Sequence, residues 1–477
     1  MRPFHRNEVT ELTISDLAFG GKGIAKVATA DGDYVVFVPN TIPGQKVQVR
    51  VVKPKARYAE AKLMQVLQPS PQEAKTAYYA IPGAPYITLP LEDQRQYKQK
   101  STLELFRRIG KIAEPEGLLD EFVSSPRSFH YRNKMEYSFS AVAYDAAQDA
   151  FVDEFALGFK KRGQWLAVEP LLGDSGMFDA QLEKFIPKIQ EYFTSRGFSA
   201  WHSKKNSGFC RMLAVKKSFL HDHLLLNLVT SSSQLQAFDA DGFKNFVLAE
   251  LGDRLAGLVH TVNDDISDRP KSTDGQQEIL HGQDFIEEEI NGLRFSISLE
   301  SFFQTNPASA ERLYQKALDY VFEKEPTSKP YILDLFSGTG TITQLLAQRA
   351  EKAQIIGVEL VEEAVQDARQ NAEANGLQGL KFYAADVGKF LLNNPQYSGK
   401  INTLTLDPPR AGIAPKTLRK VIKLGAERMV YISCNPATQA RDCLQLAEAG
   451  YQLKKFSLVD QFPHTAHIES VALFEKV

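Results

Sequence analysis

Two hydrophobic patterns divide this sequence of 477 residues. Between residues 8 and 68, apolar and polar positions alternate, as at Val47, Val49 and Val51, and glycine-rich turns separate the runs. A period of two predicts about five short strands that each bury one face, which is typical of a small closed barrel of the OB type. From residue 300 onward, apolar strands alternate with amphipathic helices, which predicts an α/β fold with a doubly wound, mostly parallel sheet.

Two further segments lie between these regions. Prolines concentrate between residues 69 and 90, and residues 94–112 then read as a helix. The stretch that follows mixes strand-like pieces with a helical run, which indicates an α+β domain. We therefore expect a barrel at 1–68, a linker and helix at 69–125, a central α+β domain at 126–298 and a Rossmann-like domain at 299–477.

Composition is that of an ordinary globular protein, with 43% hydrophobic and 24% charged residues. The 56 Lys and Arg balance 58 Asp and Glu, so the net charge of −2 gives no global sign of a polyanionic partner. No run of 18 apolar residues occurs and the start lacks an apolar signal core, so we expect a cytoplasmic protein with no membrane segment. Three cysteines are too few for a disulfide framework or a four-cysteine metal site.

Acidic residues follow the predicted strands of the C-terminal sheet. The first strand runs into a turn in which Gly338 and Gly340 allow a ligand to approach the backbone, and the second strand ends at Glu359, 19 residues after Gly340. A carboxylate at that place can bind both hydroxyls of a ribose. Asp386 and Asp407 follow the third and fourth strands. The turn lacks the third glycine of a dinucleotide site, so S-adenosylmethionine fits this crevice better than a pyrophosphate cofactor.

A thiol and a carboxylate complete the predicted site. Cys434 ends the fifth strand beside the crevice, which favours a nucleophile, whereas Cys210 and Cys443 read as buried small side chains. Near the C-terminus, Glu469 enters the last strand and is the candidate base, with His464 and His467 as alternatives. The two histidines also suggest a metal, but no third ligand has a sensible spacing, so no metal is expected.

Several stretches resemble the motifs of the RNA 5-methyluridine (uracil-C5) methyltransferase family: SFFQTNPASAERLY, LDLFSGTGTIT, GVELVEEAVQDARQNAEANG, TLTLDPPRAG, VYISCNPATQARD and HTAHIESVALFEK. FHYRNKMEYSFS and LVHTVND resemble its central segments, and the N-terminal barrel resembles the TRAM domain of its ribosomal-RNA members. The resemblance implies that Cys434 is the nucleophile and Glu469 the general base. It also implies contacts to S-adenosylmethionine from Gln304, Phe336, Glu359 and Asp407, to which its strand-end position adds Asp386. Several members carry four cysteines that hold a [4Fe–4S] cluster between barrel and catalytic part, but residues 70–90 contain none, so no cluster is expected.

Local basic charge points to RNA as the partner. Residues 46–62 hold six basic residues against Glu60, and residues 95–111 hold six against Glu104. Such clusters attract phosphates, although lysines also occur on solvated edge strands. The resemblance of the barrel favours 23S ribosomal RNA over tRNA, and we expect a monomer that acts on a flipped or looped-out uridine. A 5-methylcytosine enzyme and an inactive RNA-binding protein remain alternatives. An amino-group methyltransferase is disfavoured, because Arg410 stands where an aromatic residue would follow its DPP motif.

Overall fold

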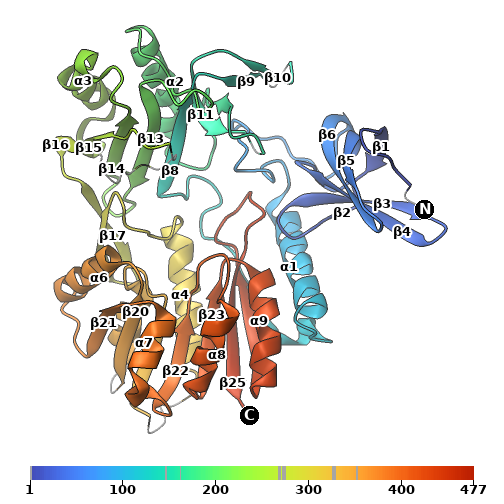
Figure 1. Cartoon of the computed structure of the whole chain (residues 1–477), viewed down its shortest axis with the longest axis vertical. Helices are drawn as coiled ribbons and strands as arrows, with labels where there is room; N and C mark the ends of the chain where they lie inside the picture. The colour runs from blue at the N-terminus through green and yellow to red at the C-terminus, as the bar shows by residue number, and fades with distance from the viewer. Residues whose placement is uncertain are drawn as a thin grey trace.

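A computed structural model describes residues 3–145, 148–161, 163–266, 270, 276–324, 329–350 and 353–477. Figure 1 shows three parts: a β-rich N-terminal part in blue, a central part in green, and a C-terminal part in orange and red. A pale blue helix, α1, runs between the blue and red parts. None of the described helices is both long enough and apolar enough to cross a membrane.

The N-terminal part is a curved antiparallel and parallel sheet with the strand order β1-β5-β6-β4-β3-β2. Alternate residues Val47, Val49 and Val51 of β5 are completely buried, and Val36 and Val38 of β4 meet them in the same core, as the period of two predicts. The described strands are β1 (Val9–Thr13), β2 (Asp16–Leu17), β3 (Lys22–Thr29), β4 (Gly32–Pro39), β5 (Lys46–Pro54) and β6 (Tyr58–Gln68).

The segment between the barrel and the central part contributes a helix and a strand to the packing of the C-terminal part. Helix α1 (Leu91–Arg108) packs on the C-terminal part, where Phe106 stacks on Phe456 with ring centroids 4.5 Å apart. A 3₁₀ turn, Pro115–Leu118, leads into β7 (Leu119–Val123), which pairs in parallel with β24 (Tyr451–Val459). The stretch expected to be a linker and helix therefore also supplies an edge strand to the C-terminal sheet, a pairing between residues too distant in sequence to be seen from local pattern.

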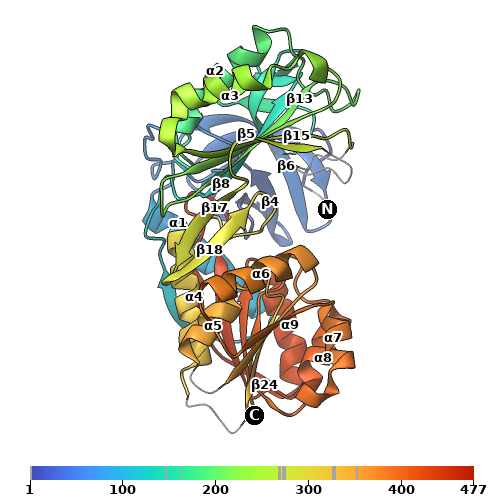
Figure 2. The same ribbon diagram turned by 90° about the vertical axis from the view of Figure 1, so that its left-hand side faces the viewer.

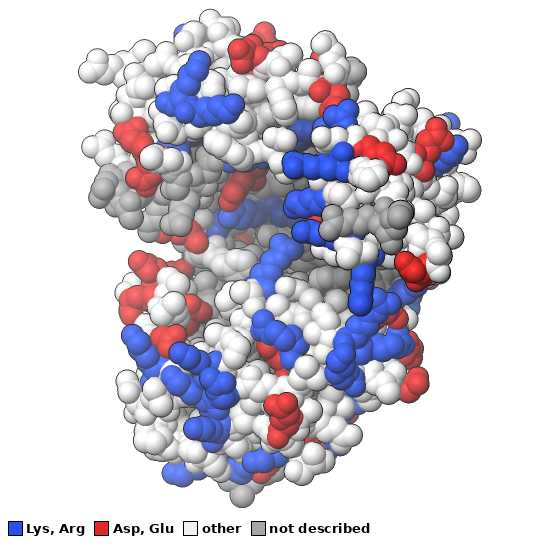
Figure 3. Space-filling view, turned by 45° about the vertical axis from the view of Figure 1, so that its right-hand side comes forward, with Lys and Arg blue, Asp and Glu red and all other residues white. Residues whose placement is uncertain are grey.

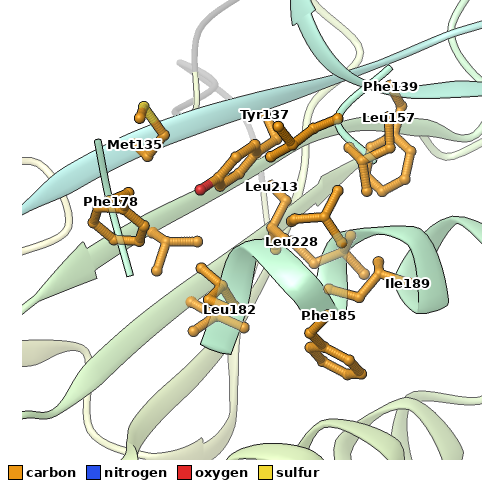
Figure 4. Packing of buried hydrophobic residues seen from close by; sticks show 14 of the residues in the cluster. Met135, Tyr137, Phe139, Leu157, Phe178, Leu182, Phe185, Ile189, Leu213 and Leu228 are labelled. Atoms are coloured by element: carbon orange, nitrogen blue, oxygen red, sulfur yellow. The ribbon is translucent and has the colours of Figure 1, made fainter. Parts of the chain in front are cut away.

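The central part is a sheet in the order β10-β9-β12-β11-β8-β13-β14-β15-β16, with helices α2 and α3 packed against it (Figure 2). Its core is apolar and aromatic: Tyr137, Leu213 and Leu228 of the sheet meet Phe185 and Ile189 of α2 (Figure 4). The described elements are β8 (Lys134–Ser140), β9 (Ala143–Asp145), β10 (Ala150–Val152), β11 (Ala156–Lys160), β12 (Val168–Pro170), α2 (Ala180–Thr194), β13 (Cys210–Lys217), β14 (Leu224–Thr230), α3 (Ala240–Leu251), β15 (Leu255–Val262) and β16 (Gln277–Gly282), with 3₁₀ turns at Leu235–Ala237 and Gly252–Arg254.

A hairpin of β17 (Phe285–Ile290) and β18 (Leu293–Ser298) connects the central and C-terminal parts. Figure 2 shows it above α4 and α6, and its residues Phe295 and Ile297 share an apolar cluster with Leu313 of α4. The same cluster holds Leu225 and Val259 of the central sheet, so the hairpin packs against both parts, and the boundary expected at 298 stays a prediction.

The C-terminal part is a doubly wound sheet in the order β21-β20-β19-β22-β23-β25-β24-β7, as predicted. The strands from β21 to β23 are parallel, while β25 pairs antiparallel with both neighbours. Its described elements are α4 (Pro307–Val321), β19 (Tyr331–Leu335), α5 (Thr341–Arg349), β20 (Gln354–Glu359), α6 (Glu362–Ala374), β21 (Leu380–Ala384), α7 (Val387–Asn393), β22 (Ile401–Leu406), α8 (Pro415–Lys423), β23 (Arg428–Ser433), α9 (Pro436–Glu448), β24 and β25 (Glu469–Lys476), with a 3₁₀ turn at Pro395–Tyr397.

Candidate active site

A cavity of about 1390 Å³ lies at the carboxyl edge of the parallel strands. Because parallel strands end at the same edge, the residues that follow them converge there. All seven site residues predicted from the sequence line this one cavity: Gln304, Phe336, Glu359, Asp386, Asp407, Cys434 and Glu469.

The turn after β19 forms one wall. Phe336, Gly338 and Gly340 all have positive φ, at 68°, 53° and 76°. At Gly340 a Cβ would lie 2.7 Å from the Phe382 ring, so only glycine fits, whereas a Cβ at Gly338 would meet nothing within 4 Å. The amide of Gly338 donates to Glu359 Oε2 over 3.0 Å, and the amide of Val361 donates to Oε1 over the same distance. The turn therefore fixes the position of the Glu359 carboxylate at the cavity, beside the open space next to Gly338.

Two aspartates lie near this wall: Asp334 is fully buried, and Asp407 is partly buried and lines the cavity. Asp334 accepts hydrogen bonds from Thr343 Oγ1 at 2.6 Å and Thr405 Oγ1 at 2.8 Å, and burial raises its pKa to about 6. Burial, together with the charge of Asp334, raises the pKa of Asp407 to about 7. Among the described residues no side chain or amide donates to the Asp407 carboxylate, which lines the cavity. The pocket thus holds carboxylates that a cationic ligand would stabilise.

Cys434 directly follows β23, and Glu469 is the first residue of β25, the antiparallel neighbour of β23. Ser433, the last residue of β23, pairs with Ser470 of β25, and Cys434 and Glu469 are the next residues outward on each side. Both side chains line the cavity, and the charge of Glu469 acts on the Cys434 thiol. The arrangement brings together the two residues predicted to be the nucleophile and the base.

Burial sets the protonation of this pair. It raises the pKa of Glu469 to about 8, with the charge of Asp407 adding to the shift. It also raises the pKa of Cys434 to about 11, helped by Glu469 and Asp407 and opposed by Arg410. The thiol is accordingly protonated at neutral pH in the absence of ligands. Cys210 and Cys443 are buried, in agreement with their structural interpretation.

The loop 460–468 joins β24 to β25 and brings its own side chains to the cavity. His467 and Thr465 line it, but His464 does not. The His464 ring stacks on Phe129 at 4.3 Å, and Gln94 Nε2 donates to its Nδ1 over 3.1 Å. Of the two histidines considered as bases, only His467 lies in the cavity. No group of three metal-ligating side chains occurs in the part of the chain that the structure describes.

Tyr314 is a cavity residue that the sequence pattern did not single out. It lies on the buried face of α4, its side chain hydrogen-bonds with Gln304, and burial raises its pKa well above 10. Tyr314 lies in the SFFQTNPASAERLY stretch, ten residues after Gln304 and on the helix that follows it. That position is the feature of the sequence from which it could have been predicted to lie near the site. The loop 298–306, which carries Gln304, is anchored to the central part: Asn133 Nδ2 donates to Gln304 O over 3.0 Å.

Basic side chains surround the hollow between the three parts (Figure 3). The excess of basic over acidic residues counted in the sequence segments 46–62 and 95–111 is partly neutralised by ion pairs in the folded protein. On the barrel, Lys46 pairs with Glu11 at 2.7 Å, and on α1, Lys100 pairs with Asp16. Arg107 pairs with two glutamates. Of the six basic residues counted in 46–62, three form no ion pair within 4.0 Å with a described residue: Arg50, Lys55 and Arg57.

Comparison with known proteins gives a consistent picture. Residues 269–477 match the sequence family described as tRNA (Uracil-5-)-methyltransferase, and residues 3–64 match the TRAM domain. An RNA methyltransferase of Clostridium acetobutylicum is 34% identical over 100% of this chain and 99% of its own length. One from Caldanaerobacter subterraneus is also 34% identical, over 99% of both chains.

A solved structure matches nearly the whole chain. It is that of the Pyrococcus abyssi tRNA (uracil-54, C5)-methyltransferase in complex with S-adenosyl-L-homocysteine. The two share 25% identity, and the match covers 98% of this chain and 100% of the other with a TM-score of 0.71. The likeness therefore includes the barrel, the central part and the sheet.

Proposed function

Because the chain belongs to the RNA uracil-C5 methyltransferase family with an N-terminal TRAM domain, we propose that it methylates C5 of a specific uridine in 23S ribosomal RNA through a covalent bond between Cys434 and C6. It is an S-adenosylmethionine-dependent RNA methyltransferase. The observation that carries the proposed mechanism is that Cys434 and Glu469 line one cavity together with the glycine-rich turn.

The cavity fits the cofactor. The open space at Gly338 admits a ligand against the backbone, and the Glu359 carboxylate beside it suits ribose hydroxyls. Asp386, Phe336, Gln304 and Asp407 line the same cavity and are the other proposed contacts to the cofactor. When bound, S-adenosylmethionine supplies a methyl group on a sulfonium cation. The buried carboxylates match that positive charge.

Cys434 and Glu469 have separate tasks in this mechanism. C5 of uracil is a poor nucleophile until a thiolate adds to C6. The Cys434 proton passes to Asp407, the Cys434 sulfur bonds to C6, and the electron pair of the C5–C6 double bond moves toward C5 and O4. C5 then takes the methyl group as its bond to the sulfonium sulfur breaks, which leaves S-adenosylhomocysteine. Glu469, in the ionised form that its raised pKa makes the minor one at neutral pH, removes the C5 proton, and the double bond re-forms as the C6–sulfur bond breaks. The released thiolate takes back its proton from Asp407.

Ribosomal RNA is the first candidate substrate because the barrel resembles the TRAM domain of the ribosomal-RNA members. The second candidate is tRNA, which the similarity to the Pyrococcus abyssi enzyme favours. Mass-spectrometric mapping of 5-methyluridine in both RNAs from a deletion strain, with and without the restored gene, decides between them. Loss of the modification from tRNA alone would replace the first candidate by the second.

A second assay tests the reaction itself. The enzyme should release tritium from RNA labelled at C5 of uracil and not from RNA labelled at C5 of cytosine. Release from cytosine alone would make the protein a 5-methylcytosine enzyme, because that chemistry also adds a thiol at C6. Release from neither base would contradict the proposed function.

A further inference from the structure

A second pocket of about 460 Å³ adjoins the active-site cavity. The two share one wall, the loop 298–306, and a rim residue from the central part. The residues that line both are Arg132, Glu300, Ser301, Phe302, Phe303 and Thr305. A ligand that extends from one cavity into the other would therefore pass over a single loop.

Phe302 is unusual on that wall. Its side chain is 70% exposed, although it lines both cavities. Its neighbour Phe303 packs inward, with its ring centroid 5.8 Å from that of Phe295. An aromatic ring left exposed at the junction of two cavities offers a flat apolar face to a ligand, and every nucleobase has a face that stacks on such a ring.

The central part holds this wall in place. Lys216 of β13 is buried, and its Nζ donates to Ser298 O at 2.5 Å and to Ser301 O at 2.7 Å. The amide of Asn133 donates to Thr305 O over 2.8 Å. These hydrogen bonds fix the backbone on both sides of Phe302. Binding of a base against the Phe302 ring therefore costs little conformational entropy of the loop.

Apolar side chains and charges of both signs line the second pocket. Met135, Phe159, Ile286 and Ile297 are apolar residues of the lining, Lys134 pairs with Glu136 at 2.8 Å, and Glu300 lies in the lining as well. The Arg132 Nε donates to Lys134 O over 3.4 Å, and its guanidinium forms no ion pair within 4.0 Å among the described residues. Apolar residues, an exposed aromatic ring and an arginine in one lining suit a base joined to a phosphate.

We propose that this second pocket binds the base of the nucleotide next to the target uridine, stacked on Phe302, with Arg132 on the phosphate between them. The proposal rests on the proposed function, because it takes the first cavity as the place of the target base. It follows that at least two consecutive bases leave the helical stack when the enzyme binds, so the substrate is a single-stranded or opened segment.

A binding cycle with a synthetic RNA tests this without catalysis. The probe is a nonamer with one uridine between adenosines, compared with the same nonamer in which both neighbours of the uridine are abasic. Affinities are measured with saturating S-adenosylhomocysteine, which has no methyl group to transfer. The variants are Phe302→Ala and, as a matched control, Phe151→Ala, which truncates another exposed ring, in β10 and outside both cavities.

Wild type and Phe151→Ala should bind the intact nonamer about 5- to 150-fold more tightly than the abasic one, the range that one stacked base provides. Phe302→Ala should lose that difference while its affinity for S-adenosylhomocysteine stays unchanged. The proposal is overturned if wild type does not distinguish the two RNAs, or if Phe302→Ala weakens both equally. Failure of the proposed function looks different: the stacking difference would persist in a protein that transfers no methyl group to uridine.

Discussion

Lys98 and Asp460 form a buried ion pair that ties α1 to the loop before β25. The Lys98 Nζ donates to Asp460 Oδ1 over 2.7 Å and to Phe462 O over 3.0 Å, and both side chains are less than a tenth exposed. Burial lowers the pKa of Lys98, and the charge of Asp460 opposes that shift. Because this loop leads directly into Glu469, the ion pair lets α1 fix the position of a segment that lines the active-site cavity.

Replacing Lys98 by Met should destabilise the protein by about 3–5 kcal/mol, because it leaves the Asp460 carboxylate buried without a partner. Lys100→Met is the matched control on the same helix. Lys100 pairs with Asp16 at the surface, with its side chain 61% exposed, so its removal should cost at most about 1 kcal/mol. Chemical denaturation of both variants measures the difference, and equal destabilisation would show that the buried pair has no special role.

Cys434→Ala should abolish methyl transfer while S-adenosylmethionine still binds, because the thiol acts on the RNA. Radiolabelled methyl incorporation and calorimetric titration of the cofactor measure the two properties. Cys443→Ala, in the buried face of α9, controls for the removal of a thiol. Activity of Cys434→Ala above about a thousandth of wild type would point to another nucleophile.

Glu469→Gln should accept one methyl group per site and then stall as a protein–RNA adduct that survives denaturing electrophoresis. The C5 proton has no base to take it, so the bond from Cys434 to C6 cannot break. Glu475→Gln, at the far end of the same strand, should turn over normally. If Glu469→Gln turns over as well, the base lies elsewhere, and His467 is the remaining candidate in the cavity.

The Glu469 carboxyl should also make stability depend on pH. Its pKa is raised from 4.5 to about 8, so between these values the folded protein keeps a proton that the unfolded chain has released. Wild type therefore loses stability as pH rises through this window, by at most about 1.4 kcal/mol per pH unit. Glu469→Gln lacks this loss, so its advantage in thermal midpoint should grow from pH 5.5 to pH 8.5. A constant difference would contradict the raised pKa.

Unpaired barrel cations should dominate the salt dependence of RNA binding. Neutralising Arg50, Lys55 and Arg57 should flatten the slope of log K against log salt by roughly 0.7–0.9 for each phosphate that the protein no longer neutralises. Neutralising Lys100 and Arg107, which have carboxylate partners, should change the slope much less. Filter binding at several salt concentrations gives both slopes, and an unchanged slope in the first variant would place the RNA away from the barrel.

The sequence predicted what depends on local pattern. Strand ends in a parallel sheet share one edge, so Glu359, Asp386 and Asp407 could be expected around one crevice from the order of strands along the chain. Contacts between side chains that folding brings together from distant parts of the chain could not be predicted from local pattern. His464 stands only three residues from His467, yet Gln94, 370 residues away in sequence, holds it outside the cavity. The ion pairs of Lys46 with Glu11 and of Lys100 with Asp16 could not be predicted either, because a count of charges along the sequence does not show which side chains lie close together.

The parallel pairing of β7 with β24 constrains how the protein is made. Leu119 lies beside Phe456, so β7 pairs with a strand that is synthesised long after it. The barrel and the central part can fold while the chain is still growing. The C-terminal sheet cannot complete this pairing until β24 has been synthesised, and until then the edge of β7 stays unpaired.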